Sequence, residues 1–80
     1  MEKLTVKAFK VLLAQRIRQL RKNAGLTQSE LATKIGFKDK QIVNNYELNG
    51  ANPTAYNLIL IAQALNVTVD DLLDFSEIEK

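Results

Sequence analysis

Residues 25–36 read GLTQSELATKIG and carry the signals of one complete short helix. Thr27, followed three residues later by Glu30, is a capping-box pattern, in which the Thr hydroxyl accepts a backbone N–H and the Glu carboxylate reaches back to the cap. Gly36 is a stop signal, because glycine adopts the left-handed backbone that a tight turn needs. Between them, three apolar residues recur at helical spacing and predict one buried face: Leu31, Ala32 and Ile35.

Four further helices are predicted on either side of this one, and no strand pattern competes with them. The first extends to about residue 24, and six of its apolar residues step by three or four: Val6, Phe9, Leu13, Ile17, Leu20 and Ala24. The others are expected over residues 40–47, 55–66 and 69–74, with a loop over 48–53. Each begins after a residue whose side chain can cap it: Thr5, Asp39, Thr54 and Thr68. The sequence therefore predicts an all-α fold of five short helices.

The inward positions of these helices predict one shared core. Six apolar residues from four stripes are expected to be buried in it: Leu20, Leu31, Val43, Leu58, Ile61 and Leu65. Two opposite charges also fall near the core. Arg21 lies beside the apolar stripe of its helix, and Glu47 comes four residues after the inward Val43. We therefore expect a partly buried ion pair between Arg21 and Glu47.

The composition is that of one small globular domain, and it excludes several kinds of site. The 80 residues are 46% hydrophobic and 25% charged. There is no cysteine and no histidine, which excludes disulfides, thiolate or imidazole metal sites and histidine-activated nucleophiles. Neither a paired-carboxylate cleft nor a phosphate-cradling glycine-rich loop is visible. We therefore predict no catalytic residue, no metal site, no cofactor and no enzymatic activity.

The sequence also lacks the signals of a membrane or exported protein. Its longest apolar run, over residues 58–62, is far shorter than the ~20 residues that a membrane span needs. The N-terminus has neither the apolar core nor the small-residue cleavage site of a signal peptide. We expect a cytoplasmic protein without a membrane partner.

Charge is distributed unevenly along the chain. Residues 1–65 carry ten Lys or Arg against four acidic residues, a net charge of +6, whereas residues 66–80 have a net charge of −4. A basic body of this kind is typical of proteins that bind a polyanion. A mixed, solvated surface with an acidic tail would give the same counts, so the charge alone does not decide the partner.

Several short sequence motifs follow one another along the chain in a fixed order. It comprises residues 16–21 (RIRQLR), 25–32, 35–36, 45–47 (NYE), Pro53 and 61–67 (IAQALNV). This series resembles the lambda-repressor-like family, the Cro/cI-type or XRE-type helix-turn-helix DNA-binding domains. The resemblance implies a sequence-specific transcriptional regulator of double-stranded DNA, more often a repressor, which acts by covering its operator. It divides the chain into an N-terminal extension of the first helix (1–13), the domain (14–74) and an acidic tail (75–80).

The resemblance assigns residues 39–47 to the recognition helix that lies in the major groove. With Val43 and Tyr46 inward, three amide side chains face outward and suit bidentate contact to adenine; these expected base-contacting residues are Gln41, Asn44 and Asn45. The expected contacts to the DNA backbone are Gln28, Lys38 and Lys40, with Arg18, Lys22 and the loop amides as further candidates. The interval from Gly36 to Val43 is one residue longer than is common in the family, which leaves two registers of base contact open.

The helix predicted over residues 55–66 is apolar on nearly all sides. Leu60 and Tyr56 fall almost opposite its core-facing residues, and Ile59 lies between the two faces. Because such a helix is normally buried on more than one side, we expect a two-fold homodimer through Tyr56, Ile59 and Leu60 and the neighbouring helix predicted over residues 69–74. Two alternatives stay open: scattered surface residues, or cover from the N-terminal residues Leu4, Val6 and Leu12.

A protein-interaction module is the main alternative function. The predicted recognition helix contains no arginine, and the tail is acidic. Both features would suit an antitoxin or an adaptor that retains the fold and binds a protein partner instead of DNA.

Overall fold

The computed structural model describes residues 3–48 and 52–78 of the chain. Within these ranges the structure contains five α-helices and no strand: α1 (Val6–Asn23), α2 (Gln28–Ile35), α3 (Gln41–Leu48), α4 (Ala55–Leu65) and α5 (Val69–Leu72). The predicted all-α fold with five helices is therefore confirmed. Part of the predicted loop (Asn49, Gly50 and Ala51) and the last residues of the predicted tail (Glu79 and Lys80) lie outside the described residues.

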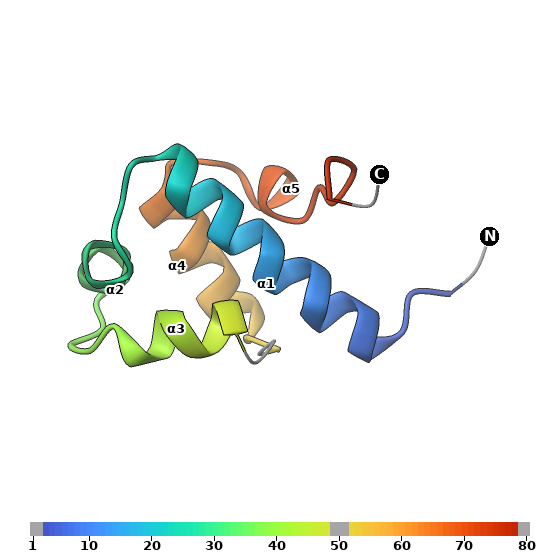
Figure 1. Cartoon of the computed structure of the whole chain (residues 1–80), viewed down its shortest axis with the longest axis horizontal. Helices are drawn as coiled ribbons and strands as arrows, with labels where there is room; N and C mark the ends of the chain where they lie inside the picture. Colours follow the sequence, from blue (N-terminus) through green and yellow to red (C-terminus); the bar gives the residue numbers. More distant parts are fainter. Residues whose placement is uncertain (1–2, 49–51, 79–80) are drawn as a thin grey trace.

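Helix α1 is the longest element, and the others lie beside its middle and its C-terminal part (Figure 1). It packs against α3 on one side and α5 on another, while α2 packs against both α3 and α4. The N-terminal part of α1 extends beyond the other helices toward one end of the molecule (Figure 1). None of the described helices is long and apolar enough to cross a membrane.

Threonine side chains start four of the helices, as the sequence predicts. The hydroxyls of Thr5, Thr27, Thr54 and Thr68 each accept the N–H of the residue three positions later, at 3.0 to 3.2 Å. Helices α2 and α5 have complete capping boxes, with the carboxylates of Glu30 and Asp71 accepting the cap's own N–H. The remaining helix, α3, begins at Gln41, whose N–H donates to Asp39 Oδ1 at 3.0 Å. Such caps each stabilise a helix by about 1 kcal/mol, because they satisfy an amide that has no partner within the helix.

The core is made by side chains from all five helices. Its largest fully buried members are Leu13, Ile17, Leu31, Val43, Ile61 and Leu72. Of the six predicted core residues, four are buried, whereas Leu20 and Leu58 are half-buried and pack against the core from its edge. A domain of this size has few positions that are covered on every side, which explains why two inward-facing leucines remain partly accessible.

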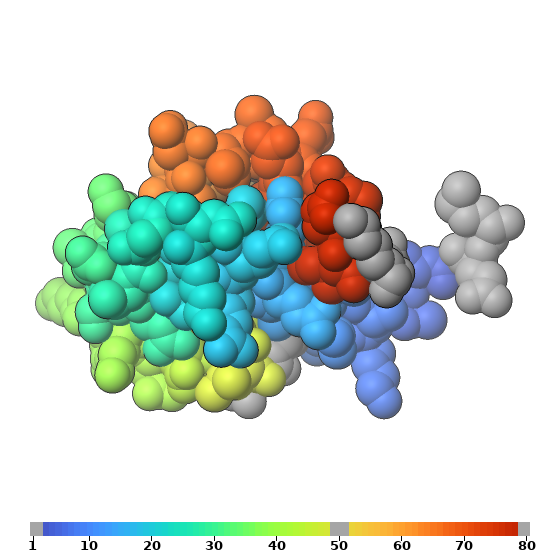
Figure 2. Space-filling view, turned by 45° about the horizontal axis from the view of Figure 1, so that its top comes forward, coloured from blue at the N-terminus to red at the C-terminus, as the bar shows by residue number. Residues whose placement is uncertain are grey.

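The C-terminal segment folds back along α1. Arg16 donates from Nε and Nη2 to the carbonyl oxygen of Asp71, at 3.0 and 2.8 Å, and thereby joins α1 to α5. Phe75, which the sequence places in the acidic tail, packs edge-on against Phe9 with 6.2 Å between the ring centroids. In the space-filling view the chain after α5 lies against the blue surface of α1 (Figure 2). The segment predicted as a frayed tail therefore begins with an aromatic ring that packs on the core.

Candidate nucleic-acid interface

Helices α2 and α3 are joined by the tight turn that the sequence predicts. Gly36 ends α2 with φ +100° and ψ 13°, in the left-handed region. The N–H groups of Gly36 and Phe37 both donate back to the carbonyl oxygen of Ala32, at 3.1 and 2.9 Å. These bonds satisfy the last carbonyls of α2 and turn the chain toward α3.

A buried ion pair fixes α3 relative to α1. Arg21 Nε lies 2.6 Å from Glu47 Oε2, and Arg21 Nη2 lies 3.0 Å from Glu47 Oε1. Only 11% of the arginine side chain and 2% of the glutamate side chain are exposed. Arg21 Nη1 also donates to the carbonyl oxygen of Leu26, at 2.8 Å, so the same side chain holds the connection before α2. The pair predicted from helical spacing is thus present, with the two parallel bonds that give arginine–carboxylate pairs their geometric specificity.

The same carboxylate is linked to the surface through an amide. Gln28 Nε2 donates to Glu47 Oε1 at 3.2 Å and to Asn44 Oδ1 at 3.3 Å. Gln28 is the first residue of α2, and Asn44 lies in the middle of α3. The bonds therefore connect the ion pair to one of the three predicted base-contacting side chains.

The outer side of α3 carries the three amides. Val43 and Tyr46 are buried, as predicted, with 0% and 6% exposure. Gln41 is exposed, and Asn44 and Asn45 are half-buried. Gln41 Nε2 donates to Asn45 Oδ1 at 3.2 Å, four residues along the same helix. The predicted phosphate contacts Lys38 and Lys40 are both exposed in the segment that leads into α3.

The phenol of Tyr46 lies on the inner side of α3. Burial raises the pKa of the Tyr46 phenol above its ordinary value, and a hydrogen bond with Asn57 of α4 partly opposes that shift.

Leu48, at the C-terminal end of α3, is 68% exposed although it is apolar. It borders a groove between α1 and α3 that sequence reasoning does not identify.

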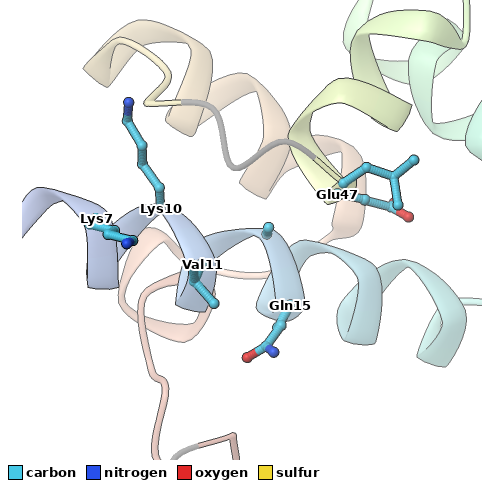
Figure 3. A pocket seen from close by; sticks show the side chains of 7 residues that line it. Lys7, Lys10, Val11, Gln15 and Glu47 are labelled. Carbon is cyan, nitrogen blue, oxygen red and sulfur yellow. The ribbon is translucent and has the colours of Figure 1, made fainter.

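This groove encloses about 380 Å³ (Figure 3). Its lining residues come from the first ten residues of α1 and from the end of α3: Lys7, Lys10, Val11, Ala14, Gln15, Glu47 and Leu48. Figure 3 shows Lys10 and Gln15 on α1 pointing to different sides of that helix, with Glu47 across from them. The lysine spacing is visible in the sequence, but the position of α1 beside the end of α3 is not.

The outer face of α4 is only partly free. Tyr56 and Ile59 are 69% and 46% exposed, whereas Leu60 is half-buried and packs against the core. The prediction that Leu60 lies opposite the core is wrong in this respect, because α4 is packed between α2 and α5 and its covered face is broad. Of the three N-terminal residues that could have covered this face, Leu4 and Val6 are themselves 51% and 62% exposed, and Leu12 is half-buried. The exposure of Leu4 and Val6 gives no support to the alternative that they find cover on α4.

Known proteins share this architecture and part of the sequence. Residues 17–72 match the family model HTH_3, described as "Helix-turn-helix". In Bacillus subtilis, the "Uncharacterized HTH-type transcriptional regulator YobD" is 36% identical over 66 residues, covering 82% of this chain and 58% of that protein. The HTH-type transcriptional regulator ImmR of the same organism is 32% identical over 68 residues, covering 85% of this chain and 53% of that protein. The chain thus spans little more than half the length of these two relatives.

Shorter relatives and solved structures match over most of their length. An HTH-type transcriptional regulator of Archaeoglobus fulgidus is 38% identical over 64 residues, covering 80% of this chain and 90% of that protein. The restriction-modification controller protein C.AhdI from Aeromonas hydrophila superposes with a TM-score of 0.73 at 33% identity, covering 79% of this chain and 94% of that one. The hypothetical transcription factor NHTF from Neisseria superposes with a TM-score of 0.79 at 29% identity, covering 99% of this chain and 91% of that one.

The residues that match the family model contain the structural features described above. The matched residues 17–72 include the ion pair, the turn at Gly36 and all of α3, and they make up more than half of the chain. The chain therefore belongs to the helix-turn-helix family of the XRE type.

Proposed function

We propose that this chain is a sequence-specific DNA-binding transcriptional regulator that reads double-stranded DNA with α3. The observation that carries the proposal is the outer side of α3, where Gln41, Asn44 and Asn45 reach the surface while the ion pair with α1 fixes the helix. A helix of this kind fits the major groove, and amide side chains offer both a donor group and an acceptor group for contact with base edges. The relatives named as transcriptional regulators support the same function.

The proposed backbone contacts lie at the start of α2 and just before α3. Lys38 and Lys40 would neutralise phosphates, and Gln28 would contribute its main-chain N–H in the first turn of α2. Few cations flank this surface, so one domain should bind DNA with modest affinity and a shallow salt dependence.

We propose a homodimer as the form that binds the operator. Tyr56 and Ile59 expose apolar surface on α4, and Leu60 borders them. A two-fold pair through this face would place two recognition helices about one DNA turn, ~34 Å, apart on a palindromic site. Pairing would also offset the modest affinity of each domain through effective concentration.

The proposed mechanism is repression in the cytoplasm by occlusion, in which the bound protein covers promoter DNA and excludes polymerase. This mechanism requires only that the protein bind the promoter DNA.

Selection from a random pool of duplex DNA tests the proposal. Selected sequences should be retained in a mobility-shift assay at low and moderate salt, while shuffled sequences of equal composition are released first. If no duplex is retained even at low salt, the proposal is wrong and a protein-interaction module, such as an antitoxin or adaptor, becomes the better explanation.

A further inference from the structure

A chain of hydrogen bonds runs from the buried ion pair to the proposed DNA-reading surface. Glu47 Oε1 lies 3.0 Å from Arg21 Nη2 and 3.2 Å from Gln28 Nε2. Gln28 Nε2 in turn lies 3.3 Å from Asn44 Oδ1. The glutamate side chain is almost fully buried, whereas Gln28 and Asn44 are half-buried at the surface.

The chemistry of this chain fixes the orientation of both amides. A carboxylate paired with arginine only accepts hydrogen bonds, so the Gln28 atom that faces Glu47 must be the nitrogen. That nitrogen carries two hydrogens, and the second is directed to Asn44. The atom of Asn44 that faces Gln28 must therefore be its oxygen, because two amide nitrogens would repel each other there.

We infer that Glu47 and Gln28 are positioning residues that make Asn44 read the base edge as a hydrogen-bond donor. This inference rests on the proposed DNA-binding function. The oxygen and the nitrogen of an amide lie on different branches of the same carbon, so with Oδ1 bonded to Gln28 the nitrogen Nδ2 is the atom of Asn44 that remains to contact a base. Both hydrogens of Gln28 Nε2 are directed to protein acceptors. Gln28 therefore contacts phosphate with its main chain and not with its side chain.

A donor at this position selects among the four bases. Guanine presents two acceptors in the major groove, O6 and N7, and thymine presents the acceptor O4. Cytosine presents a donor, and adenine presents a donor beside its acceptor. Asn44 should therefore favour guanine or thymine at the base it faces. An amide that could turn freely would bind adenine equally well.

The test compares binding to four duplexes that differ only at the position sensitive to Asn44→Ala. The wild type should favour guanine or thymine over cytosine by at least about 5-fold, the lower end for one good base contact. Gln28→Met removes both hydrogen bonds and leaves the amide free to turn, so the preference at this position should fall to near 1-fold while other positions are unchanged. Asn44→Asp keeps an acceptor for Gln28 and replaces the donor, so the preference should move to cytosine.

The controls separate this inference from the proposed function. Gln63→Met, at an exposed glutamine of α4, should leave all preferences unchanged. If Gln28→Met weakens all four duplexes equally, Gln28 acts on phosphate alone and the inference is overturned, while the proposed function stands. The inference is also overturned if Asn44→Asp keeps the wild-type preference. If the wild type retains no duplex at low salt, the proposed function itself fails.

Discussion

The carboxylate of Glu47 accepts two hydrogen bonds from the guanidinium of Arg21, at 2.6 and 3.0 Å, and the Glu47 side chain is 2% exposed. The two residues stand 26 positions apart in the sequence and belong to α3 and α1. The ion pair therefore links the proposed recognition helix to α1 at a place that is largely shielded from water.

Removing one member of this pair should destabilise the protein strongly. Glu47→Ala leaves the arginine charge buried without its partner, and we expect the free energy of unfolding to fall by about 3–5 kcal/mol. Urea denaturation measures the loss. Replacing both residues, as Arg21→Met with Glu47→Leu, should recover most of it, since no lone charge then remains. A single-variant loss below about 1 kcal/mol would contradict a desolvated pair.

A side chain at position 36 should destabilise the protein through backbone strain and not through a steric clash. A Cβ at Gly36 would meet no atom within 4 Å, but φ is +100°. Gly36→Ala should therefore lower the free energy of unfolding by about 1–2 kcal/mol, the cost of a left-handed backbone for an L residue. Thermal unfolding measures the change. Asn66→Gly is the matched control, because Asn66 already adopts φ 59° and glycine relieves that conformation; a loss of stability in this variant would argue against the explanation.

The capping box of α2 should make stability depend on acid pH. Hydrogen bonds from the main-chain N–H and the side chain of Thr27 hold the pKa of Glu30 below its ordinary value of 4.5. Because the folded pKa is the lower one, this contribution is complete above about pH 4.5 and is lost as pH falls through the folded pKa. Melting temperatures of the wild type and Glu30→Gln, measured from pH 7 to pH 2, should therefore converge in acid. A constant difference across that range would refute the linkage.

Base and phosphate contacts should respond differently to substitution. Asn45→Ala should weaken binding to the selected site by about 1–3 kcal/mol and relax the preference at one base position. Lys40→Ala should weaken all sequences about equally and reduce the salt slope by about one. Fluorescence anisotropy at several salt concentrations measures both. Unchanged preference in Asn45→Ala would select the other register that the longer turn permits.

The proposed dimer should be sensitive to charge at its most exposed residue. Tyr56→Glu places a carboxylate in the centre of the proposed face, and Tyr56 is 69% exposed, so the fold of the monomer should tolerate it. Sedimentation should show a dimer for the wild type at tens of micromolar and a monomer for the variant. Ser29→Glu, on exposed surface of α2, is the control. A wild type that sediments as a monomer at this concentration would exclude the interface.

Local signals along the chain predict the helices well, because caps and stripes depend on residues within a few positions of each other. The capping box joins Thr27 and Glu30, which are three residues apart, and Gly36 ends α2 because glycine adopts the left-handed backbone there. The ion pair is predictable by the same means, since helical spacing already directs Arg21 and Glu47 inward. A charge at such a position requires a partner, and Glu47 is an inward-facing opposite charge.

Contacts between elements are less accessible from the sequence. The bond from Gln28 to Asn44 depends on how closely α2 and α3 cross, which no periodicity specifies. The partial burial of Leu60 depends on α4 having neighbours on two sides. Phe75 lies beyond the last predicted helix, and only the return of the chain along α1 brings it to Phe9.

Arg16 joins α5 to α1 through the main-chain carbonyl of residue 71 and not through the aspartate side chain. Every amino acid has that carbonyl, so the anchor places no demand on which residue occupies the position. The Asp71 carboxylate remains committed to the cap of α5, accepting the N–H of Thr68 at 3.3 Å. Residue 71 therefore holds α5 on α1 with its main chain and caps α5 with its side chain. Substitutions at this position can change the stability of the first turn of α5 while the bonds from Arg16 persist.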